Sequence, residues 1–235
     1  MVTMDKGAKL IAAIGMLIFL VLIPIALLGG HSGWVLDFVV MIGLVLLYSL
    51  FYDVLRLNVP VFTLVIFGHV LHALGVFGWY GNSPVPIQWD HVTHVVPMIG
   101  FALMFFGWLE QYMDRGFTRK NVMIILAVFF IVTGVGALNE LSEFLSFLGR
   151  GFGEGAFAFG AGDGFEGIGR GSDVALANNM NVVGGGWINT GWDLTFNAIG
   201  AIVGIIIGLL IRAFRKEPKN AYYFEDVSEW SKRIS

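Results

Sequence analysis

The chain has 235 residues, of which 57% are hydrophobic and only 13% are charged, and 32 are glycine. A soluble globular domain has about a quarter of its residues charged, so this composition excludes a soluble enzyme and a disordered or collagen-like chain, and indicates an integral membrane protein. The absence of cysteine excludes disulfides, thiolate metal sites and cysteine nucleophiles. The formal net charge of −3 provides no overall basic field, so no nucleic-acid partner is expected.

Six segments are long and apolar enough to cross a bilayer as helices, which takes about 20 mostly apolar residues each. In chain order they are Leu10–Gly30, Gly33–Tyr52, Leu57–Tyr80, His91–Leu109, Asn121–Leu148 and Leu194–Ile211. The first segment is too long for the apolar part of a signal peptide and lacks a small-residue cleavage site, so we interpret it as an anchor. The sequence therefore predicts an all-α, polytopic bundle of six transmembrane helices within a membrane domain of residues 1–211.

The distribution of lysine and arginine predicts the orientation of this bundle. With the N-terminus inside, 12 of the 14 cations fall in cytoplasmic segments, as the positive-inside rule requires. We therefore expect both termini in the cytoplasm and residues 212–235 to form a cytoplasmic tail. The protein is predicted to be a multi-pass protein of the cell (inner or plasma) membrane, with the lipid bilayer as its partner and other membrane subunits as a further class of partner.

A glycine-rich segment, Gly149–Gly191, separates the last two predicted spans. It has 43 residues, 14 of them glycine, and loops beyond about 12–15 residues are usually functional or disordered. Its G-x-G-x-x-G pattern at Gly162–Gly167 is not flanked by a strand and a helix, so it does not indicate a dinucleotide site. We predict an outer loop that shields the outer face of the bundle.

Ionisable residues gather toward the predicted outer side of the membrane. A charged side chain in hydrocarbon costs at least about 2.5–3.5 kcal/mol, so such residues usually face the bundle interior and have a function. All five histidines and four carboxylates lie from mid-membrane outward: His31, His69, His72, His91, His94, Asp90, Glu140, Glu143 and Asp193.

Helical spacing places several of these residues on shared faces. Asp90 and His94 are four residues apart, as are Asp193 and Asn197, and Glu140 and Glu143 are three apart. Bundle cores build metal sites from inward carboxylates and histidines at such spacings, and the same groups suit acid–base chemistry. The candidate metal ligands, for a divalent transition metal, are Asp90, His94, Glu143 and Asp193. The candidate catalytic residues are Glu140, Glu143 and Asp193, and the supporting residues are His72, Asn139 and Asn197.

Each of these residues also has a structural interpretation. Asp90 and Asp193 could cap the helices that they precede or begin. Glu140 and Glu143 could belong to an interhelical hydrogen-bond network. His69 and His72 could be neutral packed histidines bonded to a neighbouring helix.

Three motifs around the candidate residues resemble those of the VanZ-like superfamily, most closely its inner-membrane YjdF-type branch and the archaeal members of that branch. The motifs are Trp89–His94 (WDHVTH), Asn139–Phe144 (NELSEF) and Trp192–Gly200 (WDLTFNAIG). They match an Asp-x-x-x-His, a Glu-x-x-Glu and an Asp-x-x-x-Asn-x-x-Gly element in the same order. The resemblance covers roughly Leu71 to Ile211 and extends to His72, Gly75, Tyr80 and Pro84.

This resemblance implies the topology and the location of a site rather than a reaction, and the glycine-rich loop is longer here than in the family. Two functions therefore stay open. The first is a metal-assisted membrane enzyme with an outward-facing His/carboxylate pocket that acts on a lipid-linked or envelope substrate. The second is a non-enzymatic binding or transport module, or a subunit of a larger membrane complex, because such clusters also relay protons or ions.

Overall fold

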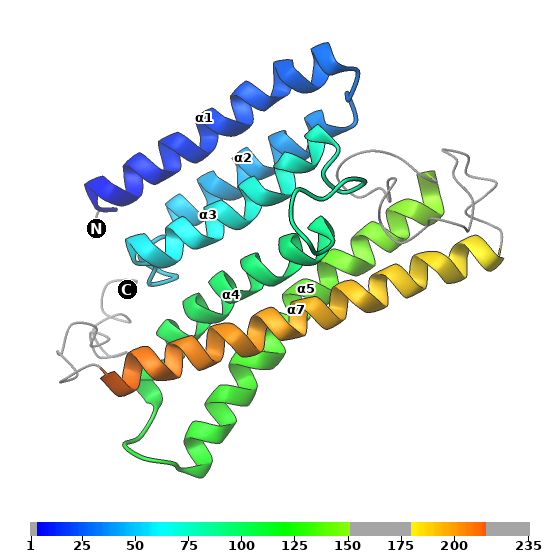
Figure 1. The fold of residues 1–235 in the computed structure, drawn as a ribbon. Helices are drawn as coiled ribbons and strands as arrows, with labels where there is room; N and C mark the ends of the chain where they lie inside the picture. Colours follow the sequence, from blue (N-terminus) through cyan, green and yellow to red (C-terminus); the bar gives the residue numbers. More distant parts are fainter. Residues whose placement is uncertain (1–3, 151–179, 215–235) are drawn as a thin grey trace, which may run out of the picture.

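The computed structural model describes residues 4–150 and 180–214 (Figure 1). All regular secondary structure in these residues is helical, which confirms the predicted all-α class. The helices are α1 (Lys6–Gly29), α2 (Trp34–Leu50), α3 (Val59–Ala73), α4 (Trp89–Leu109), α5 (Arg119–Arg150) and α7 (Met180–Phe214). Short 3-10 turns extend α3 over Leu74–Phe77 and α4 over Glu110–Tyr112.

Most of these helices are long and apolar enough to span a membrane. The five segments of sufficient length are Lys6–Gly29, Val59–Phe77, Trp89–Tyr112, Arg119–Ser146 and Asn189–Phe214. α2 is also apolar but has 17 residues, which at about 1.5 Å each cover about 26 Å of a core about 30 Å thick. The structure therefore supports a multi-pass membrane protein with five to six spans, while the number six and the orientation stay predictions.

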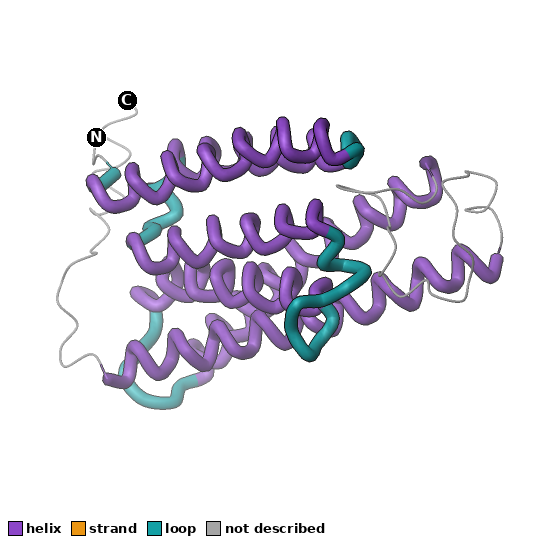
Figure 2. Tube along the Cα trace, turned by 45° about the horizontal axis from the view of Figure 1, so that its top comes forward, coloured by secondary structure: helices purple, strands orange, loops and turns teal. Residues whose placement is uncertain are grey.

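The helices form two groups joined along one contact. α1, α2 and α3 pack together, α4, α5 and α7 pack together, and α3 packs against α4 to join the groups. Figure 2 shows that the helices run roughly along one direction, with connecting loops at their ends. Successive helices alternate in direction, so the start of α4, the end of α5 and the start of α7 lie at the same end of the bundle (Figure 1).

Glycines on one face of α7 set its close approach to α4. A Cβ on Gly200 would lie 2.5 Å from the carbonyl oxygen of Val95, and a Cβ on Gly204 would lie 2.6 Å from Cβ of Ala102. Gly208 continues the same face four residues later. Small residues at this spacing let helix backbones come into contact in membranes, where packing drives helix association. This contact brings the polar residues of α7 against those of α4.

The start of α7 differs from the prediction. α7 begins at Met180 rather than Leu194, so residues 180–191 are helical where the sequence predicted loop. The ring of Trp187 packs against Phe144 of α5 at a centroid distance of 5.4 Å. Packing against α5 compensates for the weak helix propensity of glycine, about 1 kcal/mol per residue relative to alanine.

The remainder of the predicted outer loop, residues 151–179, lies outside the described residues, as do residues 215–235 of the predicted tail. The shielding role of the loop and the location of the tail therefore stay predictions.

Candidate functional site

A cavity of about 680 Å³ lies between the two helix groups and is lined by residues of α2, α3, α4, α5 and α7. Its volume is within the range of about 300–1,000 Å³ that is usual for small-molecule sites. The lining includes every candidate site residue named from the sequence: His72, Asp90, His94, Asn139, Glu140, Glu143, Asp193 and Asn197.

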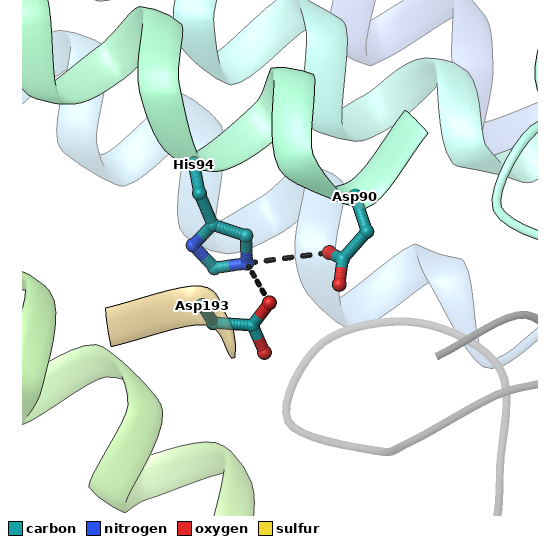
Figure 3. Close-up of side chains that lie close together, drawn as sticks. All are labelled: Asp90, His94 and Asp193. Carbon is teal, nitrogen blue, oxygen red and sulfur yellow. Dashed lines mark ion pairs between the residues drawn. The ribbon is translucent and has the colours of Figure 1, made fainter. Parts of the chain in front are cut away.

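Two aspartates from different helices meet at one nitrogen of His94 (Figure 3). The Nε2 atom of His94 lies 3.2 Å from Oδ1 of Asp90 on the preceding turn of α4, and 3.5 Å from Oδ1 of Asp193 on α7. All three residues are buried. One ligand atom of each lies within 4.8 Å of the others, so the three side chains could converge on one metal ion.

Neither aspartate is the N-cap residue of its helix, although the dipole of α4 favours a carboxylate at Asp90 in its first turn. The residue at the N-cap of α4 is Gln88, and Asp90 lies in the first helical turn and faces His94. Asp193 lies in the interior of α7 because this helix begins at Met180. The capping interpretation of Asp193 is therefore wrong, since it depended on a helix that starts near Leu194.

The other nitrogen of His94 faces an amide and a carboxylate. Its Nδ1 atom lies 3.2 Å from Oδ1 of Asn197 and 3.4 Å from Oε1 of Glu140. The Nδ2 atom of Asn197 donates a hydrogen bond of 3.2 Å to the same Oε1 of Glu140. The imidazole of His94 is therefore held between Asp90 and Asp193 on one side and Glu140 and Asn197 on the other.

Glu143 lines the same cavity but stands apart from the Asp90–His94–Asp193 cluster. Its Oε1 atom accepts a hydrogen bond of 2.8 Å from Nδ2 of Asn139, which also contacts Glu140. The structure thus places Glu143 as a second acidic group facing the cavity, one turn beyond Glu140.

The cavity has an excess of acidic groups. Its lining contains five carboxylates and four histidines, and no lysine or arginine among the described residues: Asp37, Asp90, Glu140, Glu143, Asp193, His31, His69, His72 and His94. Oε2 of Glu140 and Oδ1 of Asp193 are buried, and in the described structure neither takes part in a hydrogen bond. Buried carboxylate oxygens without hydrogen bonds are costly, so protons, water or a bound cation would complete this site.

A second hydrogen-bonded group surrounds His72. Its Nε2 atom lies 3.3 Å from Oδ1 of Asp37, which is fully buried on α2, and its Nδ1 atom lies 2.7 Å from the hydroxyl of Tyr80. Trp34 stacks on the ring of Tyr80. Asp37 was not among the site residues predicted from the sequence, although an acidic residue inside an apolar span is itself a sign of function.

The other histidines lie outside these two groups. His69 is buried, with Nε2 3.3 Å from the hydroxyl of Tyr48, which agrees with a histidine packed between helices. His91 does not line the cavity and stacks on Phe196 of α7 at a centroid distance of 3.7 Å.

The fold and the site together define a helical integral membrane protein with a buried cluster of carboxylates and a histidine. A family model described as "Predicted membrane protein (DUF2238)" matches residues 8–214, so the chain belongs to this family. No curated protein and no solved structure matches the chain.

Proposed function

We propose that Asp90, His94 and Asp193 bind a divalent transition metal, and that the protein uses it in metal-assisted chemistry on a lipid-linked or envelope substrate. The observation that carries this proposal is the orientation of His94. One ring nitrogen faces two carboxylates from different helices, and the other faces Glu140 and Asn197. Metal-binding histidines typically bond through their second nitrogen to a carboxylate or carbonyl in this way.

The distances within the cluster suit one ion. Two ligand atoms that are each about 2.1 Å from a metal lie roughly 3.0–3.4 Å apart in octahedral or tetrahedral geometry. The two distances from Nε2 of His94 are 3.2 Å to Asp90 and 3.5 Å to Asp193. Both distances from Nε2 of His94 therefore lie within or just outside the range for two ligands of one ion.

The residues around the cluster would have separate roles. A divalent metal would act there as a Lewis acid on an oxygen of the substrate. Glu140 and Asn197 would orient His94, and Glu143, which faces the cavity, would transfer protons. His72 would bind or orient the substrate from the opposite wall.

Two further assignments belong to this proposal. We place the site toward the outer face of a six-span bundle with both termini in the cytoplasm, because of the distribution of lysine and arginine. We also assign the chain to the YjdF-type branch of the VanZ-like superfamily. The support comes from the three motifs, which meet at the imidazole of His94. The residues around this ring are Asp90, Glu140, Asp193 and Asn197.

Metal analysis of protein purified in mild detergent tests the metal site. We expect near-stoichiometric metal in the wild type and loss of metal in Asp193→Asn, which keeps the side-chain shape but weakens the ligand. Asp37→Asn is the matched control, because it changes another buried aspartate of the same cavity that bonds to His72 instead. A wild-type protein that neither contains nor rebinds a metal, or equal metal loss in both variants, would refute the proposal.

The non-enzymatic alternative has an observation of its own. His72 bonds to Tyr80, the hydroxyl of Tyr80 donates to Thr93 at 3.4 Å, and Thr93 donates to the carbonyl of Asp90 at 2.7 Å. The Asp90 carbonyl accepts a hydrogen bond but cannot pass a proton on, so a proton or ion relay in a binding or transport module would use His72 and Tyr80 together with the carboxylates around His94. A metal-free wild type in which His94 carries two protons would favour this function, and its protonation is measurable by nitrogen NMR.

A further inference from the structure

The cavity changes from polar to apolar along two of its walls. On α2 the lining passes from Asp37 to Leu44, and on α4 it passes from His94 to Phe101. Each pair is seven residues apart, or about 10 Å at 1.5 Å per residue. The carboxylates therefore occupy one end of the cavity, and a section with apolar walls extends from them toward the middle of the helices, where the hydrogen-bonded pair Tyr48 and His69 lies.

The side of the cavity between α3 and α4 is closed by backbone packing. A Cβ on Gly68 of α3 would lie 2.8 Å from Cγ and 3.0 Å from Cα of Pro97 on α4. The opposite side differs, because no comparable packing joins α2 to α5 within the described residues. Both helices instead turn lining residues toward the cavity.

We name this gap the lateral opening and define it by Met41 and Leu44 of α2 and Val135 and Leu138 of α5. Val135 and Leu138 line the cavity and yet are 36% and 71% exposed, so the described part of the chain does not cover the cavity there. Leu138 lies within the apolar span Arg119–Ser146, about six residues or 9 Å beyond its midpoint. Half of the hydrocarbon core is about 15 Å, so the lateral opening faces lipid chains rather than water.

We infer that this cavity binds a membrane lipid that enters sideways through the lateral opening. The apolar chain lies along Leu44 and Met98, and the polar head group reaches the Asp90–His94–Asp193 cluster. This inference deepens the proposed function, on which the role of the head-group end depends. It assigns the substrate class as a membrane lipid whose head group carries an oxygen that the metal can bind, and a phosphate head group would require that metal because the acidic lining alone repels it.

The inference can be tested by photolabelling in reconstituted vesicles. One preparation contains a phospholipid with a diazirine on its acyl chain, and a second contains an isoprenyl phosphate with the same group. Met98 is the diagnostic residue, because it lines the cavity and is only 7% exposed. We expect mass spectrometry to find label on Met98. The probe that labels Met98 shows whether the bound lipid is a phospholipid or an isoprenyl phosphate.

Paired tryptophan variants provide the control. Leu44→Trp fills the lateral opening, whereas Leu46→Trp adds the same side chain on the opposite face of α2, where Leu46 is 47% exposed and does not line the cavity. Leu138→Trp and Leu141→Trp form a second pair on α5, in which Leu138 lines the cavity and Leu141 does not. Label on Met98 should be lost in Leu44→Trp and Leu138→Trp and kept in the other two, while all four keep the helical circular dichroism of the wild type.

Label confined to outward-facing residues such as Leu46 and Leu141, with none on Met98 from either probe, would overturn the inference. Equal label on Met98 in all four variants would also overturn it, because entry would then not use the lateral opening. Metal content measured on the same wild-type preparation separates the two proposals. Label on Met98 in a protein that binds no metal would refute the metal-assisted function while leaving lipid entry supported.

Discussion

The contact between α4 and α7 allows a strong prediction, because one methyl group should disturb both stability and metal binding. In Gly200→Ala the new Cβ would meet the carbonyl oxygen of Val95 at 2.5 Å and Cβ of Met98 at 2.8 Å. An ordinary contact begins near 3.4 Å, and the nearest atom belongs to the backbone and cannot rotate away. α7 must therefore move from α4 by about 0.9 Å at this point.

Such a shift would take the cluster beyond the reach of one ion. Moving Asp193 with α7 would lengthen its 3.5 Å distance from His94 to about 4.4 Å. Two ligands that are each about 2.1 Å from one metal cannot be more than about 4.2 Å apart. Overpacking of this kind also costs about 1–3 kcal/mol of stability.

The assay compares metal content and resistance to unfolding in detergent. Gly134→Ala is the matched control, because nothing lies within 4 Å of a Cβ at that position on α5. It should bind metal as the wild type does and gain up to about 1 kcal/mol from better helix propensity. If Gly200→Ala matched Gly134→Ala in both measurements, the argument that glycine packing positions Asp193 would be refuted.

Three other predictions test the surroundings of the site. Glu140→Gln should keep the fold and weaken metal affinity by about 10–100-fold, because it changes the group that orients the ligand histidine, His94. Unchanged affinity in a metal titration would make the role of Glu140 purely structural. Tyr80→Phe removes the 2.7 Å hydrogen bond to His72 and should cost about 1 kcal/mol in denaturant unfolding, so stability equal to the wild type would contradict the contact. The chain has no cysteine, so a single introduced cysteine reports the side of the membrane on which it lies. Asn82→Cys should react with an impermeant maleimide in intact cells, and Phe117→Cys should react only after permeabilisation. The reverse pattern would invert the predicted topology.

Much of the fold could be predicted because membrane helices follow from local composition. The length of each apolar run determines where a helix can satisfy its backbone groups inside lipid. The predicted spans accordingly overlap all six long helices of the described residues. The start of α7 could not be predicted in this way, because Gly184, Gly185 and Gly186 favour loop locally, whereas the contact of Trp187 with Phe144 comes from tertiary packing.

Part of the candidate site could also be predicted from the sequence, because residues on one helix face follow from local spacing. A four-residue spacing on one helix must bring Asp90 beneath His94, whatever the rest of the chain does. The sequence could not indicate that Asp37 bonds to His72, because these residues are 35 positions apart on different helices.

The sequence by itself determined the membrane class, the approximate helices and the same-helix pairs, because hydrophobic length and helical periodicity are local properties. Only the tertiary structure decided that Asp193, rather than Glu143, joins Asp90 at His94. The physical reason is the close packing of α4 on the glycine face of α7, which draws Asp193 and Asn197 onto the imidazole. Glu143 lies one turn beyond Glu140 on α5 and faces the open part of the cavity instead.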